Sequence, residues 1–118
     1  MRRNILKEKS KVFAIDVIRL YKKLSAEKKE YVLSKQLLRS GTSVGAMIRE
    51  AEFGQTKKDF IHKLSIAQKE INESIYWLEL LVETEYINAA EYEKYHYKGV
   101  ELLKLLTSSL KTAKLNIQ

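Results

Sequence analysis

Apolar side chains recur every three or four positions along almost the whole of this chain, and no proline interrupts them. That spacing is the period of an amphipathic α-helix. Proline breaks helices and, with glycine, builds tight turns, so 118 residues with no proline and only four glycines are poorly suited to a turn-rich β fold. The pattern therefore predicts long helices within a single domain.

Four segments carry this helical period, and short polar stretches separate them. The predicted helices cover 9–24, 31–52, 56–83 and 88–115. Helices joined by short connections pack antiparallel to their neighbours. We therefore expect an all-α fold, an antiparallel up-down-up-down four-helix bundle. The basic residues 1–8 are expected to form an arm, and 9–118 the bundle domain.

Polar residues mark where the helices begin. Ser25 is expected to cap a helical turn at the first corner. Thr56 followed by Asp59, and Asn88 followed by Glu91, resemble the capping box, in which each side chain bonds the other residue's backbone N–H. These two pairs predict the starts of the third and fourth helices.

The middle of the second predicted helix is unusually rich in small residues. They are Ser40, Gly41, Ser43, Gly45 and Ala46. A glycine inside a helix costs about 0.5–1 kcal/mol relative to alanine, so an offsetting benefit is expected. Close approach by a neighbouring helix is the main interpretation, and contact with a ligand is the alternative.

Composition excludes several classes of protein. The chain has no cysteine, which rules out disulfides, thiolate metal sites and a cysteine nucleophile. No apolar run approaches the 18 residues of a membrane-spanning helix, and the basic start lacks the apolar stretch of a signal peptide. A cytoplasmic protein with no membrane association is expected.

Two histidines each follow a carboxylate by three residues, as in di-iron bundles: Asp59 precedes His62 and Glu93 precedes His96. Both motifs begin helices that should run antiparallel, so they lie roughly 25 Å apart along the bundle at 1.5 Å per residue. One subunit cannot bring them to one metal, although a site shared between subunits stays open as a minor alternative. We expect His62 at the surface and His96 in the core or an interface.

Other catalytic patterns are equally weak. No serine has the strand–turn–helix context of a nucleophile elbow, and 41–45 lacks the Gly-Lys-Ser/Thr ending of a phosphate loop. Glu70 and Glu73 are better explained as part of a polar helix face than as an acid–base pair. The sequence predicts no enzyme, no catalytic residues, no cofactor and no metal.

Positive charge is concentrated at one end of the predicted bundle. The net charge is +7, and the end with the N-terminus, the second corner and the C-terminus gathers eleven Lys and Arg, Arg49 among them, against four acids. The candidate nucleic-acid-binding residues there are Arg2, Arg3, Lys7, Lys9, Lys11, Lys57, Lys58, Lys63, Lys111 and Lys114. Such clustering is typical of a phosphate-binding surface; a solubilising rim is the alternative. Only Phe53 and Phe60 are aromatic there, which argues against base stacking.

Apolar residues off the main stripes widen the faces of the third and fourth helices. They include Ile66, Trp77, Leu80, Leu81, Leu102 and Leu105. Wide apolar faces indicate either a thick core or a subunit interface. We expect a homo-oligomer, and a site for another protein, such as a polymerase, is the alternative use of these faces.

Two stretches resemble a known family. They are Gln36-Leu-Leu-Arg-Ser-Gly-Thr-Ser-Val-Gly45, continuing through Ile48, Glu50 and Ala51, and Lys57-Lys-Asp-Phe-Ile-His-Lys-Leu-Ser-Ile-Ala67, followed by Lys69-Glu70, Tyr76-Trp-Leu78 and Leu80-Leu81. The chain resembles, over about 13–106, the small bacterial proteins encoded within intervening sequences of 23S ribosomal RNA genes. It departs from their pattern at Met47, where asparagine is usual.

The resemblance implies a four-helix bundle, a homopentameric ring and a connection with nucleic acid. A related pentameric bundle is the accessory variability determinant of retroelements, which works with a reverse transcriptase and RNA. No catalytic residues are implied. In the shared motif we expect structural roles for Arg39, Ser40, Gly41, Ser43, Gly45 and Glu50. The leading hypothesis is a non-enzymatic, RNA-associated oligomer, and the alternative is a protein-binding scaffold.

Overall fold

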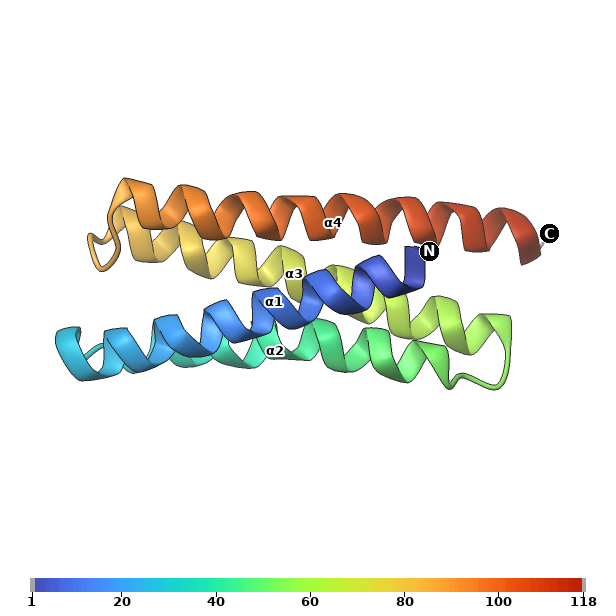
Figure 1. Ribbon diagram of the computed structural model, residues 1–118, viewed down its shortest axis with the longest axis horizontal. Coiled ribbons are helices and arrows are strands. Elements are labelled where there is room, and N and C mark those ends of the chain that lie inside the picture. Colours follow the sequence, from blue (N-terminus) through green and yellow to red (C-terminus); the bar gives the residue numbers. More distant parts are fainter. Residues whose placement is uncertain (1, 118) are drawn as a thin grey trace.

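Four α-helices and one π-helical turn make up the part of the chain that the structure describes. The computed structural model describes the backbone of residues 2–117 and the side chains of residues 5–116. In chain order the elements are α1 (Arg2–Lys23), the π-helical turn η1 (Leu24–Lys28), α2 (Leu33–Glu52), α3 (Lys57–Glu83) and α4 (Ala89–Ile117). They form a rod of 49 × 21 × 20 Å (Figure 1).

Neighbouring helices run in opposite directions. Along α1 and α4, Lys9 pairs with Glu101 at 3.1 Å, whereas Lys23 pairs with Glu91 at 2.9 Å, so rising numbers in one helix meet falling numbers in the other. Figure 1 shows the same reversal between α1 and α2, α2 and α3, and α3 and α4. Since α1 packs against both α2 and α4, the bundle closes on itself. The predicted fold class is confirmed.

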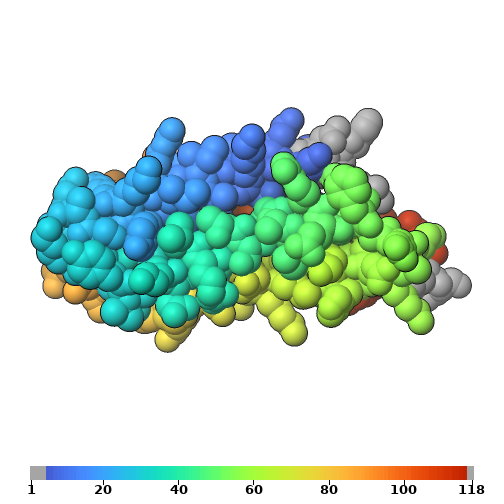
Figure 2. All heavy atoms as spheres, turned by 90° about the horizontal axis from the view of Figure 1, so that it is seen from below, coloured from blue at the N-terminus to red at the C-terminus, as the bar shows by residue number. Residues whose placement is uncertain are grey.

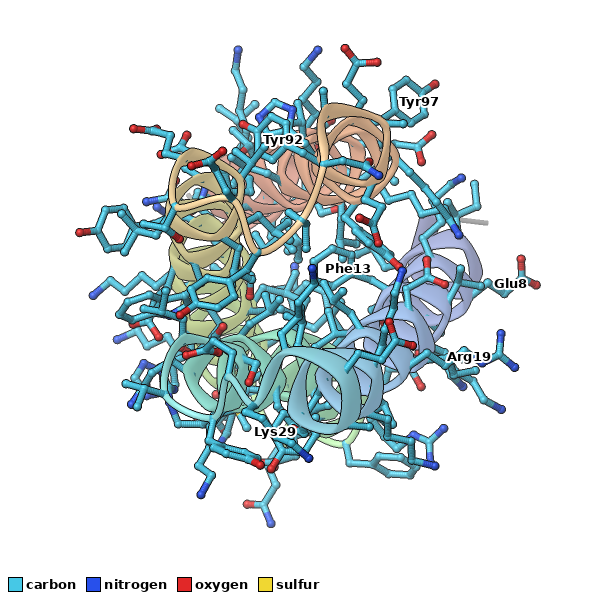
Figure 3. The ribbon with its side chains drawn as sticks, turned by 90° about the vertical axis from the view of Figure 1, so that its left-hand side faces the viewer. Glu8, Phe13, Arg19, Lys29, Tyr92 and Tyr97 are labelled. Carbon is cyan, nitrogen blue, oxygen red and sulfur yellow. The ribbon has the colours of Figure 1, made fainter. Side chains whose placement is uncertain are left out.

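The core consists of the apolar stripes that the spacing predicted. Its buried members include Phe13, Val17, Leu20, Leu37, Val44, Ile48, Leu64, Ile71, Leu78, Leu106 and Leu110. Figure 3 shows Phe13 in the centre of the bundle, between the helices. Each fully buried Leu or Phe contributes about 1.5–3 kcal/mol. Val12 and Ile18, which are also apolar, are exposed on the outer side of α1.

The first helix begins earlier than predicted. The expected start at Lys9 is wrong, because α1 begins at Arg2 and the described part of the basic arm, 2–8, forms its first turns. Leu6 is 2 % exposed and belongs to the core. It continues the seven-residue period of Phe13 and Leu20, so its burial is what extends the helix. Met1 lies outside the described residues.

Two glycines of α2 allow α1 to approach closely. A Cβ on Gly41 would lie 2.9 Å and 3.0 Å from the two γ-methyl carbons of Val17, and a Cβ on Gly45 would lie 3.3 Å from the Ser10 hydroxyl oxygen. Gly41 is buried. The interpretation of the small residues as a helix-packing site is therefore confirmed at these two positions.

The first corner is built differently from the prediction. Ser25 does not cap a helix; it lies inside the π-helical turn, and its buried hydroxyl has no hydrogen-bond partner among the described residues. The chain reverses at Lys29, whose φ is 55° and whose N–H donates to the carbonyl oxygen of Leu24. A left-handed residue of this kind ends a helix by bonding its last carbonyls.

Glu30 caps α2 instead. Its carboxylate accepts hydrogen bonds from the backbone N–H groups of Val32, Leu33 and Ser34, at 3.0, 2.9 and 2.7 Å. These are donors that the first turn of a helix cannot satisfy itself. Burial acts to raise the pKa of Glu30, but the hydrogen bonds outweigh it, and the pKa lies below its ordinary value.

The two predicted capping motifs are present. The Thr56 hydroxyl accepts from the N–H of Asp59 at 3.0 Å and starts α3. At α4 the box is reciprocal, because Asn88 accepts from the N–H of Glu91 at 2.8 Å while Glu91 accepts from the N–H of Asn88 at 3.1 Å. These caps fix where the second and third corners end.

Replacing Gly41 with alanine should destabilise the bundle. Alanine favours the helix by up to about 1 kcal/mol, but its methyl group would meet the rigid Val17 side chain, and overpacking of this kind costs about 1–3 kcal/mol. We expect a net loss in the free energy of unfolding, measured by urea denaturation. Gly45→Ala is the control and should be near neutral, because the hydroxyl of Ser10 can rotate. Stabilisation by Gly41→Ala would contradict the packing.

Acidification should remove the contribution of Glu30. Since its pKa is lower in the folded protein than in the unfolded chain, the stabilisation is complete above the unfolded pKa and is lost as pH falls through the folded one. Glu30→Gln should therefore lower the free energy of unfolding at pH 7, with a difference from the native chain that shrinks towards pH 3. A difference independent of pH would show that the carboxylate charge contributes nothing.

Candidate nucleic-acid interface

One end of the bundle collects the predicted cations. The start of α1, the connection between α2 and α3, and the end of α4 all lie at the same end (Figure 1). This arrangement follows from the antiparallel order of four helices, which brings both chain ends and the second corner together. The side chains of Arg2 and Arg3 lie outside the described residues.

Three of the candidate lysines have acidic partners. The ion pairs are Lys7 with Glu52 at 3.3 Å, Lys9 with Glu101 at 3.1 Å and Lys63 with Glu50 at 2.9 Å. Each pair joins two neighbouring helices. An adjacent carboxylate cancels much of the field that a lysine offers to an anion, so these three positions contribute less than the sequence suggested.

The other candidates are more available. Lys11, Lys58, Lys111 and Lys114 are exposed, and none of them takes part in an ion pair among the described side chains. Lys57 is exposed as well, and its Nζ donates to the carbonyl oxygen of Asn116 at 3.5 Å. That contact ties the start of α3 to the end of α4 without neutralising the charge.

A groove runs between α1 and α2 near this end. Lys7, Lys11 and Arg49 line it, its volume is about 340 Å³, and no carboxylate lines it. The remaining lining residues are small: Ser10, Ala14, Thr42, Gly45 and Ala46. Figure 2 shows the face of the molecule that α1 and α2 share. Arg49 was assigned to this end from the sequence but not to the candidate site; in the structure it lines the groove together with Lys11.

Phe53 is a second residue at this end that the sequence did not assign to the candidate site. It follows the last residue of α2 and is 81 % exposed. It lines a depression together with Arg49, His62 and Lys63, and with the carboxylates Glu50 and Asp59, of which Glu50 pairs with Lys63. An exposed phenylalanine beside an unpaired arginine is a suitable surface for a nucleic-acid base. The small number of aromatic residues at this end predicted no base stacking, but that number does not indicate whether a ring is exposed.

The charged residues of the shared motif in α2 form ion pairs with α3. Arg39 pairs with both Glu70 and Glu73 of α3, and Glu73 also accepts from the indole N–H of Trp77 at 3.3 Å. Glu50 reaches α3 as well, through Lys63. Arg39 and Glu50 thus lie on one face of α2, because eleven residues correspond to about three helical turns.

The hydroxyl groups of the motif are also partnered. The Ser40 and Ser74 oxygens lie 2.8 Å apart in the buried contact of α2 with α3, and Ser43 donates to the carbonyl oxygen of Arg39 at 2.7 Å. Met47 is partly buried and packs against the core. Where the family usually has asparagine, this chain therefore has an apolar side chain in contact with the core.

The opposite end balances its charges. Lys23 and Glu91 form an ion pair at 2.9 Å, and their hydrogen bond raises the pKa of Lys23 and lowers that of Glu91. His96 is partly buried there and stacks on Tyr92, with ring centroids 4.9 Å apart, whereas His62 is exposed at the basic end, as expected. Among the described residues, no three His, Asp or Glu side chains are grouped so that they could hold a metal ion.

Comparison with known proteins identifies relatives of this bundle. The profile of the 23S rRNA-intervening sequence proteins matches residues 2–108. The chain belongs to this family. A crystal structure of a protein of unknown function from the S23 ribosomal protein family of Bacteroides thetaiotaomicron is similar, with a TM-score of 0.93 and 55 % identity over 94 % of this chain and 99 % of that one. No curated protein matches the sequence.

The match assigns a family without assigning an activity. The solved relative is a protein of unknown function, so the match gives neither a ligand nor a partner for this chain. Over the described residues, no helix is both long enough and apolar enough to cross a bilayer.

Proposed function

We propose that this 23S rRNA-intervening sequence protein binds RNA without catalysis, through the basic end of the bundle. The observation that supports this most strongly is the groove between α1 and α2, where Lys11 and Arg49 have no ion-pair partner among the described side chains; Lys7 lines the groove as well but is paired with Glu52. Neutralising phosphates releases the counterions held by a nucleic acid, so such a surface binds polyanions with a strong dependence on salt.

The shape of the groove suits a sugar–phosphate backbone. Its small lining residues leave room for a phosphate to approach the two helices, and the cations stand at its sides. Backbone contacts fix the position of a nucleic acid but carry no sequence information. The proposed binding is therefore tolerant of sequence in the groove itself.

Phe53 adds a preference for unpaired nucleotides. Its exposed ring lies next to Arg49, at the second corner, where a base leaving the groove would meet it. Stacking of a base on an aromatic side chain is worth about 1–3 kcal/mol, and a paired base is not free to make it. Single-stranded or bulged RNA is the favoured ligand.

Self-association belongs to the same proposal. The homopentameric ring implied by the family resemblance would present five basic ends together, and several linked weak sites bind one long ligand far more tightly than one site does. Of the residues that widen the apolar faces of the third and fourth helices, Leu81 and Leu102 are buried inside the bundle, whereas the other four are partly buried and could contribute to a subunit interface: Ile66, Trp77, Leu80 and Leu105.

A protein-binding scaffold is the second candidate. Exposed aromatic side chains support it, because Tyr76 and Tyr97 are 51 % and 70 % exposed, and aromatic residues are enriched in protein interfaces. Binding to a polymerase or another protein that survives nuclease treatment, with no direct affinity for RNA, would favour this function over the first.

Charge reversal at the basic end should weaken RNA binding. Lys11→Glu/Arg49→Glu and Lys58→Glu/Lys114→Glu are each expected to raise the Kd for a structured RNA by about tenfold or more at 100 mM salt, measured by fluorescence anisotropy. The slope of log K against log salt should fall by about two units in each case, since two phosphate contacts are lost.

The matched control carries the same charge change at the other end. Lys28→Glu/Lys35→Glu also replaces two exposed lysines without ion pairs, and its effect should stay within about threefold. Equal losses in all three variants would show that net charge alone attracts RNA, and no binding by the native protein at low salt would reject the function altogether.

Removal of the Phe53 ring should separate stacking from charge. Phe53→Ala is expected to weaken binding of single-stranded RNA by about fivefold or more, with little change for a perfect duplex of the same length. Because the ring is 81 % exposed, thermal stability should be unchanged. Equal effects on single-stranded and double-stranded RNA would argue against stacking.

A further inference from the structure

A pocket at the basic end, distinct from the groove between α1 and α2, is lined by all four helices. The start of α1, the end of α2, the start of α3 and the end of α4 contribute to its wall (Figure 1). Its volume is about 410 Å³, within the roughly 300–1,000 Å³ of small-molecule sites. Its apolar wall consists of Leu6, Ala51, Phe60 and Ala113. Such a wall suits a ring system with polar groups at its edges.

Two side chains of opposite charge line this pocket among the described residues. Glu52 is the last residue of α2, and 19 % of its side chain is exposed. Lys57 is the first residue of α3, and its exposed side chain reaches the carbonyl oxygen of Asn116. A carboxylate and an ammonium group at one pocket favour a ligand that presents both hydrogen-bond donors and a negative charge. A nucleotide has both, in its base and its phosphate.

The wall also contains a hydroxyl group without a partner. The Oγ atom of Ser109 is buried and forms no hydrogen bond among the described residues. Leaving a buried hydroxyl unpaired is unfavourable, and rotation about its Cα–Cβ bond can turn it toward a polar group in the pocket. A lipid chain would leave it unpaired. The pocket therefore favours a ligand with polar edges.

The carboxylate of Glu52 distinguishes between the four bases. Its Oε2 atom pairs with the Nζ of Lys7 at 3.3 Å, and its Oε1 atom has no partner among the described residues. Each carboxylate oxygen can accept two hydrogen bonds, so both remain available to a ligand. Guanine presents two adjacent donors, N1–H and N2–H₂, which match the two oxygens of a carboxylate as a guanidinium group does. Adenine, cytosine and uracil each place an acceptor beside their donor, and that acceptor would face the carboxylate.

Lys7 connects this pocket to the cationic groove. It lines the groove between α1 and α2, and it also pairs with Glu52 in the wall of the pocket. The two sites are therefore adjacent, so a strand whose phosphates lie in the groove can place a neighbouring base in the pocket. Turning out an unpaired base costs less than opening a base pair, which favours single-stranded RNA at this position.

We propose that this pocket binds a guanine base of single-stranded RNA, with Glu52 accepting hydrogen bonds from N1–H and N2–H₂ and Lys57 contacting the phosphate. The groove holds the RNA backbone without regard to sequence, and the pocket adds a preference for guanine. The site rests on the RNA-binding function proposed above, because the base reaches the pocket as part of a strand.

Mononucleotides test the pocket without the rest of the strand. Binding to the full chain is measured by chemical-shift titration in NMR spectra. Guanosine monophosphate is expected to bind about tenfold or more tightly than the adenosine, cytidine and uridine monophosphates, since a bidentate contact discriminates by that amount. Inosine monophosphate lacks the N2 amino group and should bind guanosine's site several-fold more weakly. Equal affinity for all four nucleotides, or no binding of guanosine monophosphate, would overturn the proposal.

Glu52→Gln separates recognition of the base from attraction of the backbone. It replaces one acceptor with a donor and also releases Lys7 from its ion pair. Affinity for guanosine monophosphate should fall about tenfold or more, whereas affinity for oligo-uridine should stay the same or rise, because the groove gains a free cation. A merely structural role would weaken both. Parallel loss of both affinities would therefore overturn the proposal.

Glu50→Gln is the matched control. It removes the same charge at the same end and releases Lys63 from its ion pair, but Glu50 does not line the pocket. The preference for guanosine monophosphate over the other nucleotides should be unchanged, and an effect equal to that of Glu52→Gln would contradict the assigned site.

Ala113→Leu provides a second variant that leaves every charge in place. Leucine is a good helix former, and its larger side chain would fill part of the pocket from α4. Guanosine monophosphate should bind about tenfold or more weakly, with circular dichroism confirming the fold. If oligo-uridine binds with a steep salt dependence but guanosine monophosphate does not bind, the pocket is rejected and the RNA-binding function stands. If neither binds, both proposals are rejected.

Discussion

The close contact of α1 with α2 at Gly41 sets the geometry of this bundle. Only a residue without a side chain lets the backbone of α2 approach the methyl groups of Val17 so closely. That approach continues to Gly45 and Ser10 and places Lys11 beside Arg49. The same contact therefore explains two features. The small residues of α2 let α1 approach closely, and they also leave space at the surface between the two helices, where the cationic groove lies.

Periodicity predicted the helices, their direction and most of the core, since a stripe of spacing three and four has one way to be buried in a bundle of four. It failed where the information is not periodic. The helix starts at Arg2 because Leu6 extends the seven-residue period of Phe13 and Leu20, a single apolar residue within a basic segment. The first corner depends on Glu30, a carboxylate before α2 that accepts hydrogen bonds from three backbone N–H groups. Such a cap has no fixed spacing in the sequence by which it could be predicted.

The candidate site was predicted as a region but not as a set of residues. An antiparallel order of four helices places both chain ends and the second corner at the same end of the bundle, so the basic end was predictable from the topology. The rotation of each helix about its axis decides which lysines meet a carboxylate. The sequence does not define that rotation, and it therefore did not predict the ion pairs of Lys7, Lys9 and Lys63. Exposure of Phe53 depends on how α2 ends, at a residue whose surroundings the sequence does not define.

The contact of α1 with α4 differs from the other three in the distance along the chain that it spans. Lys98 with Asp16 and Lys9 with Glu101 join residues 82 and 92 positions apart, whereas the other helix pairs are consecutive in the chain. Local contacts have the lower loop-closure cost, so α1 with α2, α2 with α3 and α3 with α4 should assemble before this boundary closes. Ion pairs across it weaken as salt rises, so we expect the boundary between the first and last helices to separate before the other three as the salt concentration increases.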